Sequence, residues 1–302
     1  DYVSLITPSR WFAGDGQNRS FPQLRRYMRE REREISKMVY FPDENEVFKT
    51  AITSPGGIDY FLFDKFYDGL TQFTISYQGH KTTCKRPLFE NEANVITVGE
   101  FTQNILDKVK RREGFISLSS LATGRSPFGI GGKHAPEISS LDPFLGSTPL
   151  MCAYATIRYI DPRIIEKGRK LFDSYKVFIS KSTGHPGKDK GRILPLPYVA
   201  LPEEACTDAL IAIGCFDNLQ ETKNLAKYLK TKFLRFMVSL SKSSQNVYQN
   251  VYQFVPIQDF TDNSDIDWNR PLAEIDYQLY RQYELSEKEI EKIEETVSEM
   301  PD

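Results

Sequence analysis

Residues 206–260 read CTDALIAIGCFDNLQETKNLAKYLKTKFLRFMVSLSKSSQNVYQNVYQFVPIQDF, and this stretch decides the fold. Residues 208–216 are mostly apolar and bounded by polar residues, which is typical of a buried strand. From Glu221 to Leu240 the apolar residues recur with the period of a helix and fall within about 120° of one another. The stripe consists of Leu225, Leu229, Phe233, Phe236, Met237 and Leu240. The sequence therefore predicts a strand, then one long amphipathic helix packed on a core.

Basic residues follow the other sides of this helix. Lys223, Lys227 and Lys230 lie opposite the stripe, and Lys232 and Arg235 lie on one flank. The turn that follows offers hydrogen-bond donors suited to phosphates or base edges, among them Lys242 and Gln245. Taken alone, such lysines are typical of an ordinary solvated helix face.

The charge of the chain is unevenly distributed. The 302 residues can form one large or two ordinary domains, and 40% apolar residues are ample for a core. From residue 259 to the end, 4 Lys and Arg stand against 14 Asp and Glu, so this part carries a net charge of −10. Residues 1–258 carry a net charge of +8. A basic body with an acidic tail is consistent with a polyanionic partner.

The cysteines and histidines give no metal pattern. Cys84, Cys152, Cys206 and Cys215 show no CxxC spacing, and the three histidines lie far apart. We expect reduced thiols, a cytoplasmic protein and no structural zinc. No apolar run reaches the length of a membrane span, and no signal peptide opens the chain.

The first part of the chain is typical of one end of an α/β sheet. Strands are expected at residues 2–6, 37–41 and 57–64, the first of them buried, with a helix over residues 20–33 whose Leu24 and Met28 face inward. Such a sheet is incomplete, and the chain begins with Asp1, not Met, in the middle of what looks like a strand, so we expect a piece of a longer polypeptide. Further expectations are a hairpin over 72–87, a helix over 99–112, strands at 150–160 and 176–180, and a helical pair over 271–300 with a Ser286–Glu289 capping box.

Several short motifs resemble enzyme signatures without completing them. Residues 12–16 (FAGDG) form a glycine turn that does not stand directly between a strand and a helix, so an ordinary loop is the better interpretation. Glu46 and Lys49 are one residue too far apart for a PD…ExK nuclease, and residues 131–134 (GGKH) do not match a phosphate-binding loop. No D/N-P-P-Y/F motif and no nucleophile–base pair can be nominated by spacing.

Two basic loops are better candidates. The loop over residues 123–134 has glycines that let the backbone approach a ligand closely, and its donors are Arg125, Ser126, Lys133 and His134. The loop over 180–192 offers Lys181, Lys188, Lys190 and Arg192 to phosphates. Each alone is typical of a solvated loop, but beside a basic helix they indicate nucleic-acid binding.

Runs along most of the chain carry a resemblance to one family. They are YVSLITPSRWFAGDG, GRSPFGI, KVFISKSTG, CTDALIAIG, LAKYLKTKFLRFMVSLSKSSQ, VYQFVPIQDF and EIDYQLYRQYELSEKEIEKIEE. In this order they resemble the C-terminal part of Eco57I-like adenine-specific DNA methyltransferases of restriction–modification systems.

The resemblance implies a mixed α/β (α+β) fold in three parts. Residues 1–70 would be the last strands of a Rossmann-like catalytic domain, 71–260 a DNA target-recognition domain and 261–302 a helical tail. The family methylates adenine N6 with S-adenosylmethionine, but the NPPY and cofactor motifs would precede Asp1. No catalytic or cofactor-binding residue is therefore assigned, and we expect this chain alone to be inactive.

The implied partner is double-stranded DNA, together with a restriction subunit or nuclease domain of the same system. Base flipping requires a domain that grips the duplex, with phosphate contacts for affinity and base-edge contacts for sequence choice. We predict Arg125 and Gln245 as base readers. The predicted phosphate contacts are Lys181, Lys190, Arg192, Lys230 and Lys242. Two alternatives stay open: a subunit-docking module that uses the acidic tail, and a self-contained enzyme that uses the FAGDG turn.

Overall fold

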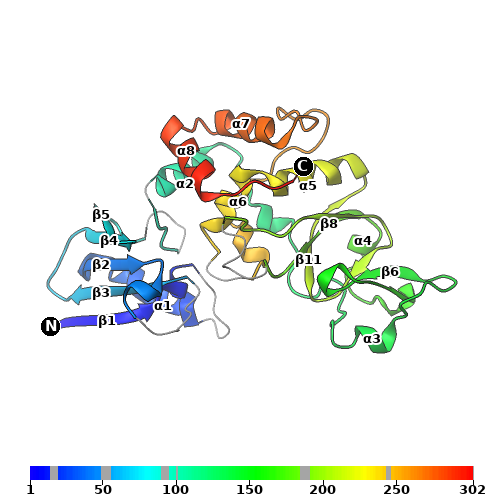
Figure 1. Cartoon of the computed structure of the whole chain (residues 1–302), viewed down its shortest axis with the longest axis horizontal. Helices are drawn as coiled ribbons and strands as arrows, with labels where there is room; N and C mark the ends of the chain where they lie inside the picture. Colours follow the sequence, from blue (N-terminus) through cyan, green and yellow to red (C-terminus); the bar gives the residue numbers. More distant parts are fainter. Residues whose placement is uncertain are drawn as a thin grey trace. The chain divides into compact units, whose positions relative to one another are not determined.

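The computed structural model describes residues 1–13, 20–48, 56–89, 95–99, 101–183, 191–242 and 246–301 (Figure 1). The chain divides into two compact units. The first unit comprises residues 1–104 and 240–244, and the second comprises residues 105–239 and 245–302. The mixed α/β fold class predicted from the sequence is confirmed.

A five-stranded mixed sheet with the order β1-β3-β2-β4-β5 forms the first unit. β3 runs antiparallel to both β1 and β2, whereas β2 and β4 are parallel and β4–β5 is a hairpin. The strands are β1 (Tyr2–Pro8), β2 (Ile35–Phe41), β3 (Ile58–Asp64), β4 (Thr71–Tyr77) and β5 (His80–Arg86), and the helix is α1 (Ser20–Glu30). Short 3-10 turns cover Ser9–Phe12, Glu32–Glu34 and Glu44–Glu46. Because β4 pairs with β2, the expected boundary at residue 70 falls within this sheet.

Two expectations about burial in this unit are wrong. β1 is an exposed edge strand, with Tyr2 71% and Ile6 60% exposed, because among the described strands it pairs only with β3. In α1, Met28 faces the core as expected, but Leu24 is 36% exposed and Arg25 is buried instead. Arg25 lies inside because its Nη1 donates a hydrogen bond to the carbonyl oxygen of Trp11 at 2.8 Å.

Asp59 is a buried carboxyl in β3, and its side chain has no exposed surface. It accepts hydrogen bonds from Thr7 Oγ1 at 3.0 Å and from Trp11 Nε1 at 3.1 Å. Burial is the main cause that raises the pKa of Asp59 from 3.8 to about 6, against these donors, which lower it. The folded state therefore favours the protonated carboxyl.

This pKa predicts a pH dependence of stability. A folded-state pKa above the unfolded value contributes stability that is complete below about pH 4 and is lost as the pH rises through about 6. The asparagine of the Asp59→Asn variant does not titrate, so the variant does not lose this stability as the pH rises. The free energy of unfolding of the variant should therefore increase by about 1–2 kcal/mol relative to that of wild type between pH 4 and pH 7. Denaturant unfolding of both proteins across that range measures it. A difference that stays constant with pH contradicts the assignment.

The second unit contains two three-stranded sheets, with the orders β10-β6-β7 and β11-β8-β9. Its strands are β6 (Thr148–Met151), β7 (Ile157–Ile160), β8 (Tyr175–Ser180), β9 (Tyr198–Ala200), β10 (Ala205–Cys206) and β11 (Leu210–Phe216). Its helices are α3 (Ala135–Ile138), α4 (Arg169–Phe172), α5 (Leu219–Lys230), α6 (Lys232–Ser239), α7 (Leu272–Gln282) and α8 (Glu287–Thr296), and α2 (Thr102–Arg111) leads into them. Short 3-10 turns cover Leu118–Ser120, Ala153–Ala155, Pro162–Ile164 and Gln249–Tyr252. The predicted strand over 150–160 is instead the hairpin β6–β7.

The expected long helix over 221–240 is two helices, α5 and α6. Thr231 separates them because its backbone is extended, with ψ at 147°, and its Oγ1 accepts a hydrogen bond from Leu234 N at 3.2 Å, as an N-cap does. The predicted apolar stripe is buried except for Leu240, which is half-buried. α5 packs on β8, β9 and β11, and α6 packs on α7 and α8.

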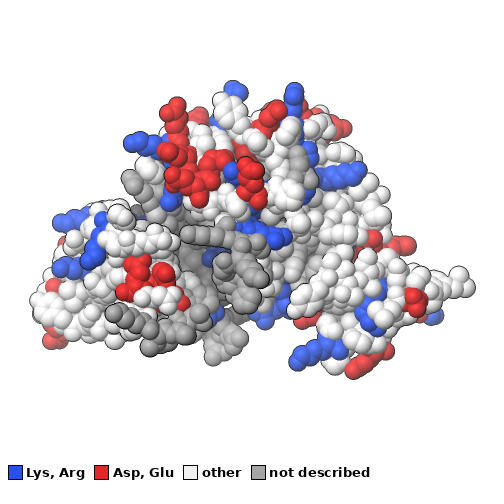
Figure 2. Space-filling model, in the orientation of Figure 1, with Lys and Arg blue, Asp and Glu red and all other residues white. Residues whose placement is uncertain are grey.

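The acidic tail folds back on the second unit. The predicted capping box is confirmed, since Ser286 N donates to Glu289 Oε2 at 2.7 Å and the Ser286 side chain caps the helix in return. Lys108 Nζ lies 2.7 Å from Glu289 Oε2. Figure 2 shows the acidic side chains gathered over α8. The acidic C-terminal part of the sequence thus contributes an acidic patch over α8 in the second unit.

Among the described residues, no helix combines the length and apolar character needed to cross a bilayer.

Candidate nucleic-acid interface

The loop over residues 123–134 is hydrogen-bonded to β11 at its start and, near its other end, to the segment between β10 and β11. Thr123 N donates to Ala212 O at 2.8 Å, and Ala212 N donates to Thr123 Oγ1 at 3.0 Å. At the other end, Asp208 N donates to Ile130 O at 2.8 Å. Arg125 and Ser126 therefore lie between two hydrogen-bonded anchors.

Asp208 joins this loop to Lys181. Its Oδ1 accepts a hydrogen bond from Gly132 N at 2.7 Å, and its Oδ2 lies 3.2 Å from Lys181 Nζ. The Gly132 N–H is the main cause that lowers the pKa of Asp208, with a further contribution from the ammonium group of Lys181. A Cβ at position 132 would lie 3.3 Å from Asp208 Oδ1, so glycine permits this close approach. The two basic loops predicted from sequence thus meet at one carboxylate.

A third segment, residues 246–249, contacts residues 181 and 182. Val247 N donates to Lys181 O at 2.8 Å, and Ser182 forms an antiparallel bridge with Asn246. The Arg125 guanidinium lies over the Tyr248 ring, 4.4 Å from its centroid, a cation–π arrangement that restrains its position.

The structure also adds a fourth segment, which the sequence reasoning missed. Lys167 Nζ donates to Ser126 O at 3.1 Å, and a Cβ on Gly168 would lie 2.6 Å from Pro127 O. Residues 163–170 read RIIEKGRK, half of them basic, and this run was the signal available in the sequence. We call the set Arg125, Ser126, Lys133, His134, Lys167, Lys181 and Tyr248 the basic cluster. Its Lys133 and His134 are exposed, and His134 Nδ1 lies 3.3 Å from Glu137 Oε2.

The remaining predicted contacts are placed elsewhere or lie outside the described residues. Arg192 is beside α6, where its carbonyl oxygen accepts from Arg235 Nη1 at 3.4 Å. Lys230 is half-buried at the end of α5. Lys242 belongs to the first unit, and burial lowers its pKa to about 8. Lys188, Lys190 and Gln245 lie outside the residues that the structure describes.

The expected basic flank of the long helix is wrong. Lys232 Nζ is paired with Glu294 Oε2 at 2.5 Å, and Arg235 is 1% exposed. Burial lowers the pKa of Arg235 to about 10, against the attraction of Asp276. Lys232, whose side chain is 16% exposed, and Arg235 are therefore held inside the helical layer and are poorly placed to meet a ligand at the surface.

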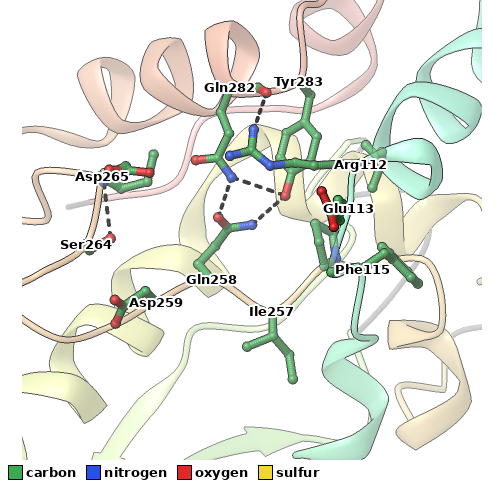
Figure 3. A pocket seen from close by; sticks show the side chains of 14 residues that line it. Arg112, Glu113, Phe115, Ile257, Gln258, Asp259, Ser264, Asp265, Gln282 and Tyr283 are labelled. Atoms are coloured by element: carbon green, nitrogen blue, oxygen red, sulfur yellow. Dashed lines mark hydrogen bonds between the residues drawn. The ribbon is translucent and has the colours of Figure 1, made fainter.

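A cavity of about 220 Å³ lies elsewhere in the second unit, between the end of α2, residues 256–266 and the end of α7 (Figure 3). Gln258 Nε2 donates to Tyr283 Oη at 2.8 Å, and Gln282 Nε2 donates to Gln258 Oε1 at 2.8 Å. Tyr283 in turn stacks on Phe233 with ring centroids 4.9 Å apart. These polar groups satisfy one another, so the network holds the helices together and offers no nucleophile–base pair.

No catalytic centre emerges from the described residues. In that part of the chain, no group of three or more His, Cys, Asp or Glu residues could hold a metal ion. The four cysteines are free thiols. Residues 14–16 of the FAGDG turn and Lys49 lie outside the described residues.

Comparisons with known proteins give structural neighbours only. No family model matches this chain, and no curated protein matches it. The chain is similar over 98% of its length to the type IIG restriction endonuclease BpuSI, with 13% identity and a TM-score of 0.38. It is likewise similar over 98% of its length to the type IIL restriction-modification enzyme MmeI, solved in complex with DNA, with 10% identity and a TM-score of 0.49. The chain covers 46% and 49% of these two structures, about half the length of each.

Proposed function

We propose that this chain binds double-stranded DNA sequence-specifically, as the target-recognition part of an adenine-N6 DNA methyltransferase of a restriction–modification system. The observation that carries the proposal is the basic cluster, in which contacts join segments from four parts of the chain, two of them at the Asp208 carboxylate. DNA recognition needs cations for phosphates and at least one held group for base edges.

The cluster offers both kinds of group. Lys133 and Lys167 are exposed, and Lys181 is one-third exposed, so their ammonium groups can meet phosphates at the surface. Arg125 is exposed while its guanidinium rests on Tyr248, which leaves its donor edge free to face a guanine O6/N7 pair. A restrained planar fork of this kind loses less entropy when it reads a base.

The methylation part of the proposal rests on the sequence resemblance. The methyl donor of that family is S-adenosylmethionine, and no residue of this chain is assigned to it. The chain's own contribution would be to grip the duplex while the target adenine leaves the stack. A restriction subunit or nuclease domain is the further partner that the resemblance suggests.

A binding titration with a randomised duplex pool, at two salt concentrations, tests the proposal. Enrichment of one short adenine-containing motif in the bound fraction, with affinity falling steeply in salt, is the expected result. Absence of binding at low salt would overturn it and favour the subunit-docking alternative.

Lys181→Ala provides a residue-level prediction. Removal of one phosphate contact should weaken binding to all duplexes by a similar factor. It should also reduce the slope of log affinity against log salt concentration by about 1. Titrations at several salt concentrations measure both quantities. Lys288→Ala, which removes an exposed lysine from the acidic helix α8, is the matched control and should change neither. Equal behaviour of the two variants would contradict the role of Lys181.

A further inference from the structure

The turn between β6 and β7 places two residues other than glycine in a left-handed backbone. Tyr154 and Ala155 both have left-handed backbones, with φ at 58° and 55°. The turn is closed by hydrogen bonds from Cys152 N to Thr156 O at 2.8 Å and from Thr156 N to Ala153 O at 3.2 Å. Glycine and asparagine suit such turns, because a tyrosine or alanine Cβ is crowded in this conformation.

The side chain at the tip of this turn is an aromatic ring in solvent. Tyr154 is 102% exposed, so burial of its ring contributes nothing to folding. The strands beneath are firmly held, since Leu150, Ile160 and Cys206 are each 0% exposed in one core. The protein thus presents a rigidly supported aromatic ring where folding alone would favour a small residue.

The turn leaves its sheet beside the basic cluster. β10 runs parallel to β6, and Thr207, the next residue after β10, donates from its N to Met151 O at 2.9 Å. Met151 is the last residue of β6, immediately before the turn, and Asp208 is the carboxylate that holds Gly132 and Lys181. Tyr154 and the phosphate-binding candidates therefore emerge from the same end of this sheet.

We propose that Tyr154 stacks on a base of the duplex held by the basic cluster and acts as a wedge at an opened base step. This inference rests on the proposed function and adds to it a contact that is neither a phosphate contact nor a base-edge hydrogen bond. Aromatic rings stack on bases of any identity, and wedges at base steps unstack and kink a duplex. The neighbouring cations favour a polyanion over an apolar protein surface as the partner of this ring.

The test compares the full chain with Tyr154→Ala, Tyr154→Phe, Tyr154→Gly and Tyr277→Ala. The last is the matched control, because Tyr277 is also exposed, at 59%, but lies on α7. The probe is a labelled duplex recovered from the bound fraction of the randomised pool. Tyr154→Ala should bind about 10-fold more weakly or worse, and Tyr154→Phe and Tyr277→Ala should bind as wild type does.

Two further readouts separate stacking from other roles. A stacking contact neutralises no phosphate and so releases no counterions when DNA binds. Tyr154→Ala should therefore keep the wild-type salt dependence of the affinity, in contrast to Lys181→Ala. Tyr154→Gly should keep or raise Tm while it weakens binding, because glycine relieves the left-handed backbone. Binding by Tyr154→Ala equal to wild type overturns this inference alone. Failure of the wild-type chain to bind any duplex overturns the proposed function and this inference together.

Discussion

Replacing Asp276 with alanine should lower the unfolding free energy of the second unit by about 3 kcal/mol or more. The carboxylate of Asp276 on α7 is 4% exposed and caps α6 from outside that helix. It accepts hydrogen bonds from Lys232 N at 2.9 Å and from Phe233 N at 2.8 Å. Alanine would leave these two buried N–H groups without their acceptor.

The loss is enlarged by a neighbouring buried cation. Arg235 is 1% exposed and hydrogen-bonds the carbonyl oxygens of Lys230 and Thr231 through its Nε, at 3.0 and 3.2 Å. Its positive charge is stabilised by Asp276. Removal of Asp276 leaves this buried charge with backbone carbonyl oxygens but without its anion, and loss of a buried ionic partner is among the more destabilising single changes.

Denaturant unfolding of wild type and variants measures this effect. Glu274→Ala is the matched control, since it removes an exposed carboxylate from the same helix and should change stability by less than about 0.5 kcal/mol. Asp276→Asn keeps the shape and one acceptor, so its loss should be intermediate. A loss from Asp276→Ala no larger than that from Glu274→Ala would show that α6 does not depend on this cap.

Replacing Arg125 with alanine should remove sequence choice at one base pair, with a loss of discrimination of about 10- to 100-fold. The reason is geometric: the guanidinium is held over Tyr248, 4.4 Å from the ring centroid, and its donors form a planar fork that fits guanine. Sequencing of the duplexes bound from a randomised pool, for wild type and variant, measures the change position by position.

Arg125→Lys distinguishes a base reader from a phosphate contact. Lysine keeps the positive charge but cannot reproduce the fork, so this variant should retain affinity for unselected DNA while it loses choice at the same position. Tyr248→Leu removes the supporting ring and should lose part of the choice, whereas Tyr248→Phe should keep it. If Arg125→Lys selects the same sequences as wild type, Arg125 is not a base reader.

Local patterns in the sequence predicted much of the second unit. The apolar run of β11, the stripe through α5 and α6 and the Ser286–Glu289 capping box all depend on neighbours within a few residues. The period of a helix places side chains on faces, and the stripe is buried except for the half-buried Leu240. The same short-range logic identified the glycine- and arginine-containing loop around Arg125 as a candidate.

Only the tertiary structure shows which basic side chains remain exposed to a ligand and which residues lie next to them. Lys232 and Arg235 look equivalent to the other helical cations in sequence, but partners 41 to 62 residues away neutralise or bury them. Lys181 is connected to Gly132 only through Asp208, which contacts both. Tyr154 is exposed because the backbone turns there, although the surrounding apolar residues predict one continuous strand. The physical reason is that hydrophobic periodicity reports burial along one element, whereas ion pairing and loop proximity depend on contacts between elements distant in the chain.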